Sequence, residues 1–173
     1  MSRLLFVLLA LVPHAAFAHP GHVEGGWNAG FAHPFLGWDH MVVMIAIGLW
    51  AARSRRAWIP LAFVSVMIAG AGAALVGLSM PAVEPVILAS TVIVAALALG
   101  SPIGAGLTLA VVSLFAFFHG FAHGAEMPAD GAAGSFIAGF AGASLILHGA
   151  GFAAGKAATF ARESWRKRWA TAK

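Results

Sequence analysis

The chain has 173 residues, of which 61% are hydrophobic and only 9% are charged. An ordinary soluble domain is about half apolar and about one quarter charged, so this composition excludes that class. The chain has no cysteine, which excludes disulfide frameworks, thiolate zinc sites and iron–sulfur clusters. The formal net charge is +4, but the basic residues lie at the ends of apolar segments, so we expect no nucleic-acid partner.

Residues 1–18 have the three regions of a secretory signal peptide. Arg3 supplies the positive charge, residues 4–12 are apolar, and Ala16-Phe17-Ala18 forms a small-residue cleavage site. We expect cleavage after Ala18, so that the mature chain begins at His19. An uncleaved anchor helix is the alternative, and the short apolar region disfavours it.

Five apolar segments follow, at about 34–52, 57–78, 82–99, 103–126 and 134–155. Their lengths are close to the roughly 20 residues that a helix needs to cross a bilayer. The connections are short and contain turn-forming residues, so no linker divides the chain. The predicted fold is all-α: a polytopic membrane bundle of about five helices at 19–158, followed by a basic amphipathic tail at 159–173.

The distribution of charge predicts the orientation of this bundle. The first connection carries Arg53, Arg55 and Arg56, and most other basic residues follow the fifth segment. Short loops rich in Lys and Arg stay in the cytoplasm, which places the C-terminus inside and the mature N-terminus outside. All acidic residues except Glu163 then fall at or near the outer face. We expect this acidic mouth to attract cations.

Ionisable side chains inside a membrane span cost a few kcal/mol each and are therefore functional candidates. In the first predicted span, His33 and His40 are seven residues apart, which would place them on the same face of one helix. Asp39 is close enough to orient the His40 ring or to turn inward as a ligand. His33 precedes Pro34, so an interfacial position at the start of the helix is its alternative.

The fourth predicted span contains the strongest signal. His119, His123 and Glu126 have spacings of four and three, so they project from one side of a helix over two turns. A lone histidine in an apolar helix is more often a packing residue, but three ionisable groups on one stripe would be unpaired in a dry location. The predicted orientation places His40 and His119 at the same depth, each roughly 10 Å below the outer boundary.

Two further ionisable residues each have two interpretations. Glu84 begins the third span at the outer face, where it would supply an oxygen ligand or lie at the interface as a carboxylate near a helix N-terminus. His148 lies in the inner half of the fifth span. It is either a relay toward the cytoplasm or a hydrogen-bonded packing residue.

Imidazoles and carboxylates without a thiolate suit Ni²⁺, Co²⁺ or Zn²⁺, and also Mn²⁺ or Fe²⁺. Calcium and magnesium prefer sites made only of oxygen ligands. We expect a bound or transported metal ion and no prosthetic group; haem is disfavoured by the small glycine-rich faces and the adjacent carboxylates. The candidate metal ligands are His33, Asp39, His40, Glu84, His119, His123 and Glu126.

Two segments also resemble the motifs of a known family, the HupE/UreJ nickel permeases. Residues 33–40 resemble its His-x5-Asp-His motif, and residues 118–126 resemble its Phe-His-Gly-x-Ala-His-Gly-x-Glu motif. The resemblance covers essentially the whole chain, including Glu84. It implies import of Ni²⁺, and also of Co²⁺, across the bacterial inner membrane to supply the maturation proteins of hydrogenase or urease.

The predicted function is therefore secondary transport of a divalent transition metal from periplasm to cytoplasm. The chain has no Gly-x-x-x-x-Gly-Lys-Ser/Thr loop, so it has no nucleotide-hydrolysing motif of its own. The alternative is an intramembrane metal-dependent hydrolase or other metalloenzyme that uses the same residues to activate water. A metal sensor without transport is a third interpretation. The lipid bilayer is an expected partner, and no oligomeric state is predicted.

Overall fold

The computed structural model describes residues 26–100, 104–127 and 132–171. Within these ranges the chain is helical and has no strand, which confirms the predicted all-α class. The helices are α2 (Trp27–Leu36), α3 (Trp38–Arg53), α4 (Ile59–Leu75), α5 (Val83–Gly100), α6 (Ala105–Ala125) and α7 (Ala133–Thr171). The predicted signal peptide at 1–18 lies outside the described residues.

Helices occur at all five positions where membrane spans were predicted. Three of them, α5, α6 and α7, are long and apolar enough to cross a membrane, and α2 with α3 forms a fourth candidate. Helix α4 is apolar but has only 17 residues. Large apolar side chains such as Leu88, Leu107 and Leu114 are exposed on the surface of the bundle, where lipid would cover them. The chain is thus a multi-pass membrane protein.

The first predicted span is broken at Gly37. Its backbone is extended (φ −94°, ψ 108°), and α2 and α3 meet there at an angle of 82°. A Cβ atom added to Gly37 would lie 2.7 Å from Nδ1 of His40 and 2.8 Å from Oδ1 of Asp39, so glycine leaves room for this pair. The prediction that His33 and His40 share one helical face was therefore wrong. They lie on two helices, and the bend brings them together.

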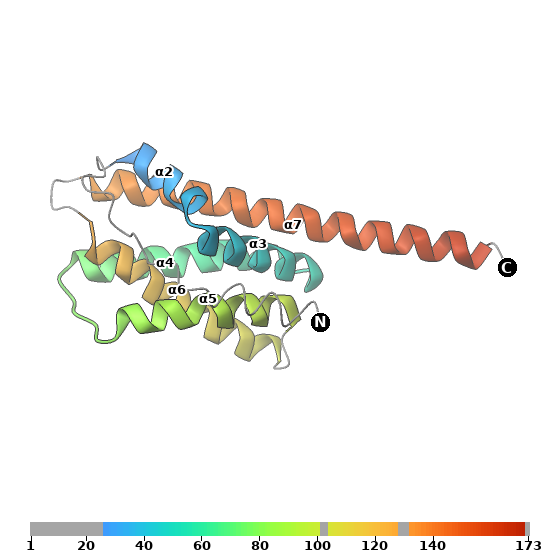
Figure 1. Ribbon diagram of the computed structural model, residues 1–173, viewed down its shortest axis with the longest axis horizontal. Helices are drawn as coiled ribbons and strands as arrows, with labels where there is room; N and C mark the ends of the chain where they lie inside the picture. Colours follow the sequence, from blue (N-terminus) through green and yellow to red (C-terminus); the bar gives the residue numbers. More distant parts are fainter. Residues whose placement is uncertain (1–25, 101–103, 128–131, 172–173) are drawn as a thin grey trace.

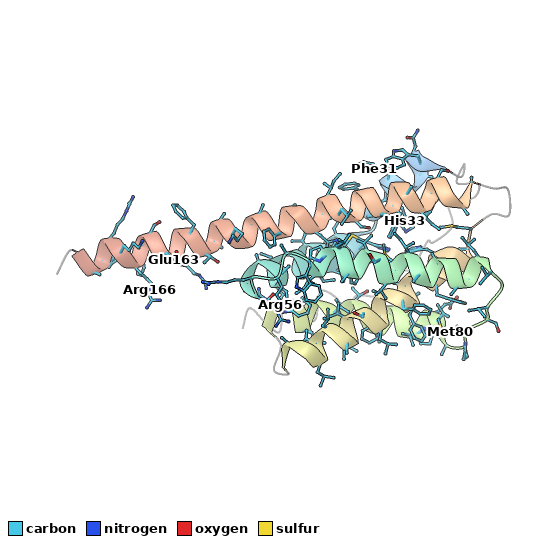
Figure 2. All side chains as sticks on the ribbon, turned by 180° about the vertical axis from the view of Figure 1, so that it is seen from behind. Phe31, His33, Arg56, Met80, Glu163 and Arg166 are labelled. Atoms are coloured by element: carbon cyan, nitrogen blue, oxygen red, sulfur yellow. The ribbon has the colours of Figure 1, made fainter. Side chains whose placement is uncertain are left out.

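Helix α7 is the longest element, with 39 residues (Figure 1). Helices α2 and α3 pack along it, α4 packs against α6, and α5 lies beside α3 and α6. Nearly all side chains from 156 to 170 are exposed, and the C-terminal part of α7 projects beyond the bundle (Figure 1), so the predicted tail continues this helix as far as Thr171. Figure 2 shows Glu163 and Arg166 on the projecting part.

The two ends of the bundle differ in their polar residues. We call the end where α3 begins the histidine end, and the opposite end, which carries the α3–α4 connection with Arg53, Arg55 and Arg56, the arginine end. Figure 2 shows Arg56 and Met80 at opposite ends. Each helix can therefore be described as running toward the histidine end or toward the arginine end.

Glycines allow the most closely packed helices to touch through their backbones. A Cβ atom added to Gly120 of α6 would overlap the carbonyl of Met67 in α4. Between α3 and α7, Gly48 and Gly151 each face a backbone carbonyl of the partner helix in the same way. Small residues at helix contacts are typical of membrane bundles, where van der Waals packing replaces the hydrophobic effect. The helices that carry the histidines are therefore held at short, fixed separations.

Candidate metal centre

The two motif segments meet at His40. Its Nε2 atom lies 2.9 Å from Nε2 of His119 and 3.2 Å from Nε2 of His123. On the other side of the ring, Nδ1 lies 3.0 Å from Oδ1 of Asp39. A carboxylate only accepts, so Nδ1–H of His40 donates to Asp39 and, in the neutral ring, Nε2 is left with a lone pair directed at α6. These contacts show that the two motif segments lie side by side in the bundle.

The distances from Nε2 of His40 to the Nε2 atoms of His119 and His123 suit ligands of a single ion. Imidazole nitrogen binds a divalent transition metal at about 2.1 Å. Two such nitrogens are then about 3.0 Å apart at a right angle and about 3.4 Å apart at the tetrahedral angle. The distances of 2.9 and 3.2 Å from His40 to its two neighbours are close to this range. Nε2 of His40 can therefore share one metal ion with either neighbour.

A fourth imidazole comes from α2. Ligand atoms of His33, His40 and His123 all lie within 4.8 Å of one another. The His33 ring meets the His123 ring edge-on at a centroid distance of 4.7 Å and the His40 ring at 5.1 Å. Since α2 reaches this position only through the bend at Gly37, the break in the first span completes the cluster. We call His33, His40, His119 and His123 the histidine cluster.

Phe140 of α7 covers one side of the histidine cluster. Its ring centroid lies 4.9 Å from that of His123, 5.6 Å from that of His33 and 6.1 Å from that of His40. Phe140 is only 4% exposed, so it keeps water from this side of the imidazoles. Phe140 was not among the predicted site residues, because a phenylalanine in an apolar span has no local signal that separates a site wall from ordinary core. An ion here would exchange much of its hydration shell for imidazole.

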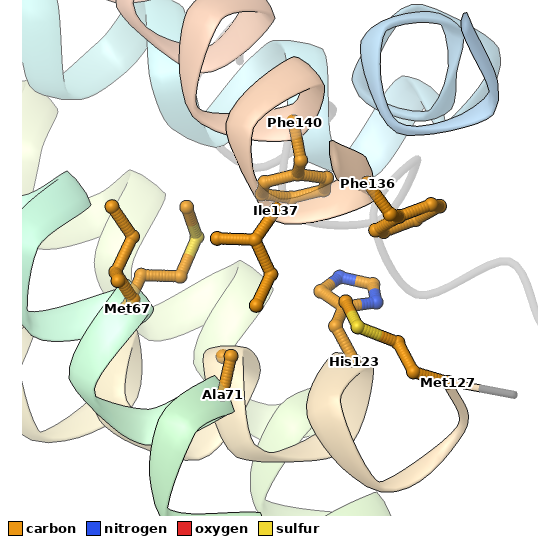
Figure 3. Close-up of a pocket in the computed structure, with 9 residues that line it drawn as sticks. Met67, Ala71, His123, Met127, Phe136, Ile137 and Phe140 are labelled. Atoms are coloured by element: carbon orange, nitrogen blue, oxygen red, sulfur yellow. The ribbon is translucent and has the colours of Figure 1, made fainter. Parts of the chain in front are cut away.

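A small apolar cavity adjoins the cluster between α4, α6 and α7. Figure 3 shows His123 and Met127 facing Phe136 and Phe140 across it. His123 is the only ionisable group among its lining residues. This cavity therefore offers an ion no second ligand of the imidazole or carboxylate type.

A second, small cavity is lined at one end by Asp39, His40 and His119. It extends between α3, α4, α5 and α6 to Met44 and Phe63, which lie nearer the arginine end. Ionisable groups thus line one part of the cavity, and the rest is lined by apolar and thioether side chains together with the hydroxyl residues Ser90 and Thr91 of α5. This cavity leads away from the cluster into the bundle.

The predicted carboxylates differ in their positions. Asp39 contacts His40, and its side chain is 35% exposed, whereas that of His40 is 10% exposed. Glu84 is exposed in the first turn of α5, and Glu126 is exposed at the C-cap of α6. Helix α6 ends at Ala125, and Glu126 follows as its C-cap, with its N–H bonded to the carbonyl of Ala122. Both glutamates lie at the histidine end, and their role as ligands stays a prediction.

Comparison with known proteins adds independent information. A family model described as HupE / UreJ protein matches residues 7–172. The protein is also similar to Protein HupE of Rhizobium leguminosarum bv. viciae, with 39% identity over 152 residues. That alignment covers 85% of this chain and 80% of the relative. No solved structure matches the chain.

Proposed function

The chain belongs to the HupE/UreJ family, and from this premise we propose that it is a permease for Ni²⁺, and also for Co²⁺, from periplasm to cytoplasm. The observation that carries the proposal is the convergence of four imidazoles from α2, α3 and α6. The family is associated with nickel and cobalt transport for hydrogenase and urease. We propose that the imported metal supplies the maturation of such an enzyme.

The donor set supports a borderline divalent ion as the substrate. Nitrogen ligands from imidazole favour Ni²⁺, Co²⁺ and Zn²⁺ over Mg²⁺ and Ca²⁺, which prefer oxygen. The carboxylate of Asp39 holds the proton of His40 on Nδ1 and adds a negative charge near the ion. The cluster thus selects by ligand type, and no redox chemistry is required of the metal.

The path begins at the exposed carboxylates of the histidine end. Glu84 and Glu126 concentrate cations there and offer oxygen ligands at the mouth. The ion then loses water as it binds among His40, His119 and His123. An inside-negative potential favours inward movement of a divalent ion by about 4.6 kcal/mol per 100 mV. Binding at the cluster must remain weak enough for release.

The charge distribution supports the direction of transport. The arginine end carries Arg53, Arg55 and Arg56, which the positive-inside rule assigns to the cytoplasm. The histidine end then faces the periplasm, and the projecting part of α7 lies in the cytoplasm. We propose the bacterial inner membrane as the location.

Uptake of radiolabelled nickel and cobalt into proteoliposomes tests this function. We expect metal accumulation with the unaltered protein and none with His40→Ala or His123→Ala, because each change removes a ligand from the centre of the cluster. Phe160→Ala is the control, since this side chain is 73% exposed on the projecting part of α7.

Variants are compared at equal amounts of membrane-inserted protein. Wild-type transport by both histidine variants would refute the site. Metal-dependent hydrolysis of an ester or amide lipid without metal accumulation would instead establish the metalloenzyme alternative.

A further inference from the structure

His148 is a fully buried histidine of α7 outside the histidine cluster, with 0% of its surface exposed. Its Nδ1 atom lies 2.6 Å from the backbone carbonyl oxygen of Ser144. Its Nε2 atom has no hydrogen-bond partner among the residues that the structure describes. The ring packs against that of Phe63 in α4, with 5.3 Å between the centroids.

These contacts determine which nitrogen of His148 is available. A carbonyl oxygen only accepts, so Nδ1–H donates to Ser144 and Nε2 of the neutral ring keeps a lone pair. Metal-binding histidines show this arrangement, in which one nitrogen donates to a backbone carbonyl and the other binds the ion. As a packing residue alone, His148 would leave a buried polar atom unsatisfied, at a cost of about 1–3 kcal/mol.

Two helices give the same depth for His148. Phe140 of α7 touches the histidine cluster. His148 comes eight residues later in the same helix, which is about 12 Å along its axis. In α3, Gly48 packs against the His148 carbonyl and follows His40 by eight residues, which again gives about 12 Å. His148 therefore lies about 12 Å from the cluster toward the arginine end.

Phe63 connects His148 with the cavity that leads from the cluster. This cavity begins at His40 and His119, and the Phe63 ring forms part of its lining. The same ring contacts His148. The Phe63 ring thus lies between this cavity and the His148 imidazole.

We propose that Nε2 of His148 is a second, transient binding position for the divalent transition metal on its way to the arginine end. This inference rests on the proposed transport function and adds the inner half of the path. A single imidazole binds the ion more weakly than the four of the cluster, so the ion is passed on. Multiple sites of moderate strength are what conduction through a protein requires.

Two substitutions separate this role from a packing role, because the two roles predict opposite rank orders. His148→Leu fills the space with an apolar side chain and removes the lone pair, whereas His148→Gln keeps an amide oxygen that can bind an ion. If His148 only packs, Leu satisfies the apolar surroundings better, and its protein should be at least as stable and as active as wild type. If Nε2 binds the ion, Leu should transport more slowly than Gln.

The experiment measures initial rates of Ni²⁺ uptake into proteoliposomes over a range of external concentrations, together with thermal unfolding in detergent. For His148→Leu we expect a maximal rate at least tenfold lower, an unchanged half-saturating concentration and an unfolding temperature no lower than wild type. The maximal rate of His148→Gln should fall between those of wild type and His148→Leu. Leu147→Val, a change at the neighbouring buried residue that keeps the imidazole, should leave the rate per folded protein unchanged.

The outcomes distinguish this inference from the function on which it rests. Wild-type protein that takes up no metal would overturn the transport function itself. Wild-type uptake together with equal or faster uptake by His148→Leu would overturn only the inner position. Aggregation of both His148 variants would also overturn it, since the imidazole would then be required for folding.

Discussion

Asp39→Asn tests how the carboxylate acts on the histidine cluster. The substitution keeps the shape of the side chain and an oxygen that accepts the Nδ1–H of His40, but it removes the negative charge. With the metal about 2.1 Å beyond Nε2, the carboxylate lies about 7 Å from the ion. The Coulomb attraction of a divalent ion at that distance is about 1.2 kcal/mol in water and about 4.7 kcal/mol at an effective dielectric constant of 20.

The Asp39 side chain is 35% exposed, so water screens part of this attraction and the lower half of the range applies. Loss of a group that orients a metal-binding histidine typically weakens metal affinity by about 10- to 100-fold, or about 1.4–2.7 kcal/mol. The lower half of the Coulomb range and this loss of affinity agree. We therefore expect Asp39→Asn to raise the half-saturating Ni²⁺ concentration by about 10- to 100-fold and to change the maximal rate much less.

The assay is concentration-dependent uptake into proteoliposomes, supported by calorimetric Ni²⁺ binding to the detergent-solubilised protein. Glu163→Gln makes the same chemical change on an exposed residue of the projecting part of α7, and it should have no effect. An unchanged half-saturating concentration for Asp39→Asn would refute the orienting role. Complete loss of binding at any Ni²⁺ concentration would refute it as well, because Asp39 would then be an indispensable ligand.

Two further predictions concern the packing and the mouth of the site. Gly120→Ala should lower the free energy of unfolding by roughly 1–3 kcal/mol, because the added Cβ would overlap the carbonyl of Met67. Gly72→Ala is the control, since there is open space around Gly72. Equal unfolding temperatures for the two variants would contradict the packing role of Gly120. Glu84→Gln and Glu126→Gln should each raise the half-saturating concentration at low ionic strength, with the effect fading in high salt because both carboxylates are exposed. An equally large effect at high salt would argue against attraction at the mouth.

Local patterns were sufficient for the helices and for contacts within one helix. The apolar segments predicted the positions of α3 to α7, since the hydrophobic length needed to cross a bilayer is a local property. The spacing of four placed His119 and His123 on one side of α6, and both reach His40. Glu126 is the C-cap of the same helix, and its role as a ligand stays a prediction.

The sequence alone therefore determined the helical class, the segments that enter the membrane and the side chains available for chemistry. Only the tertiary structure decided which of these side chains meet. The 82° bend at Gly37 places His33 against His123, and the packing of α7 places Phe140 over both rings. These contacts join residues far apart in the chain, so they depend on how whole helices pack against one another, which the periodicity within a single helix does not encode.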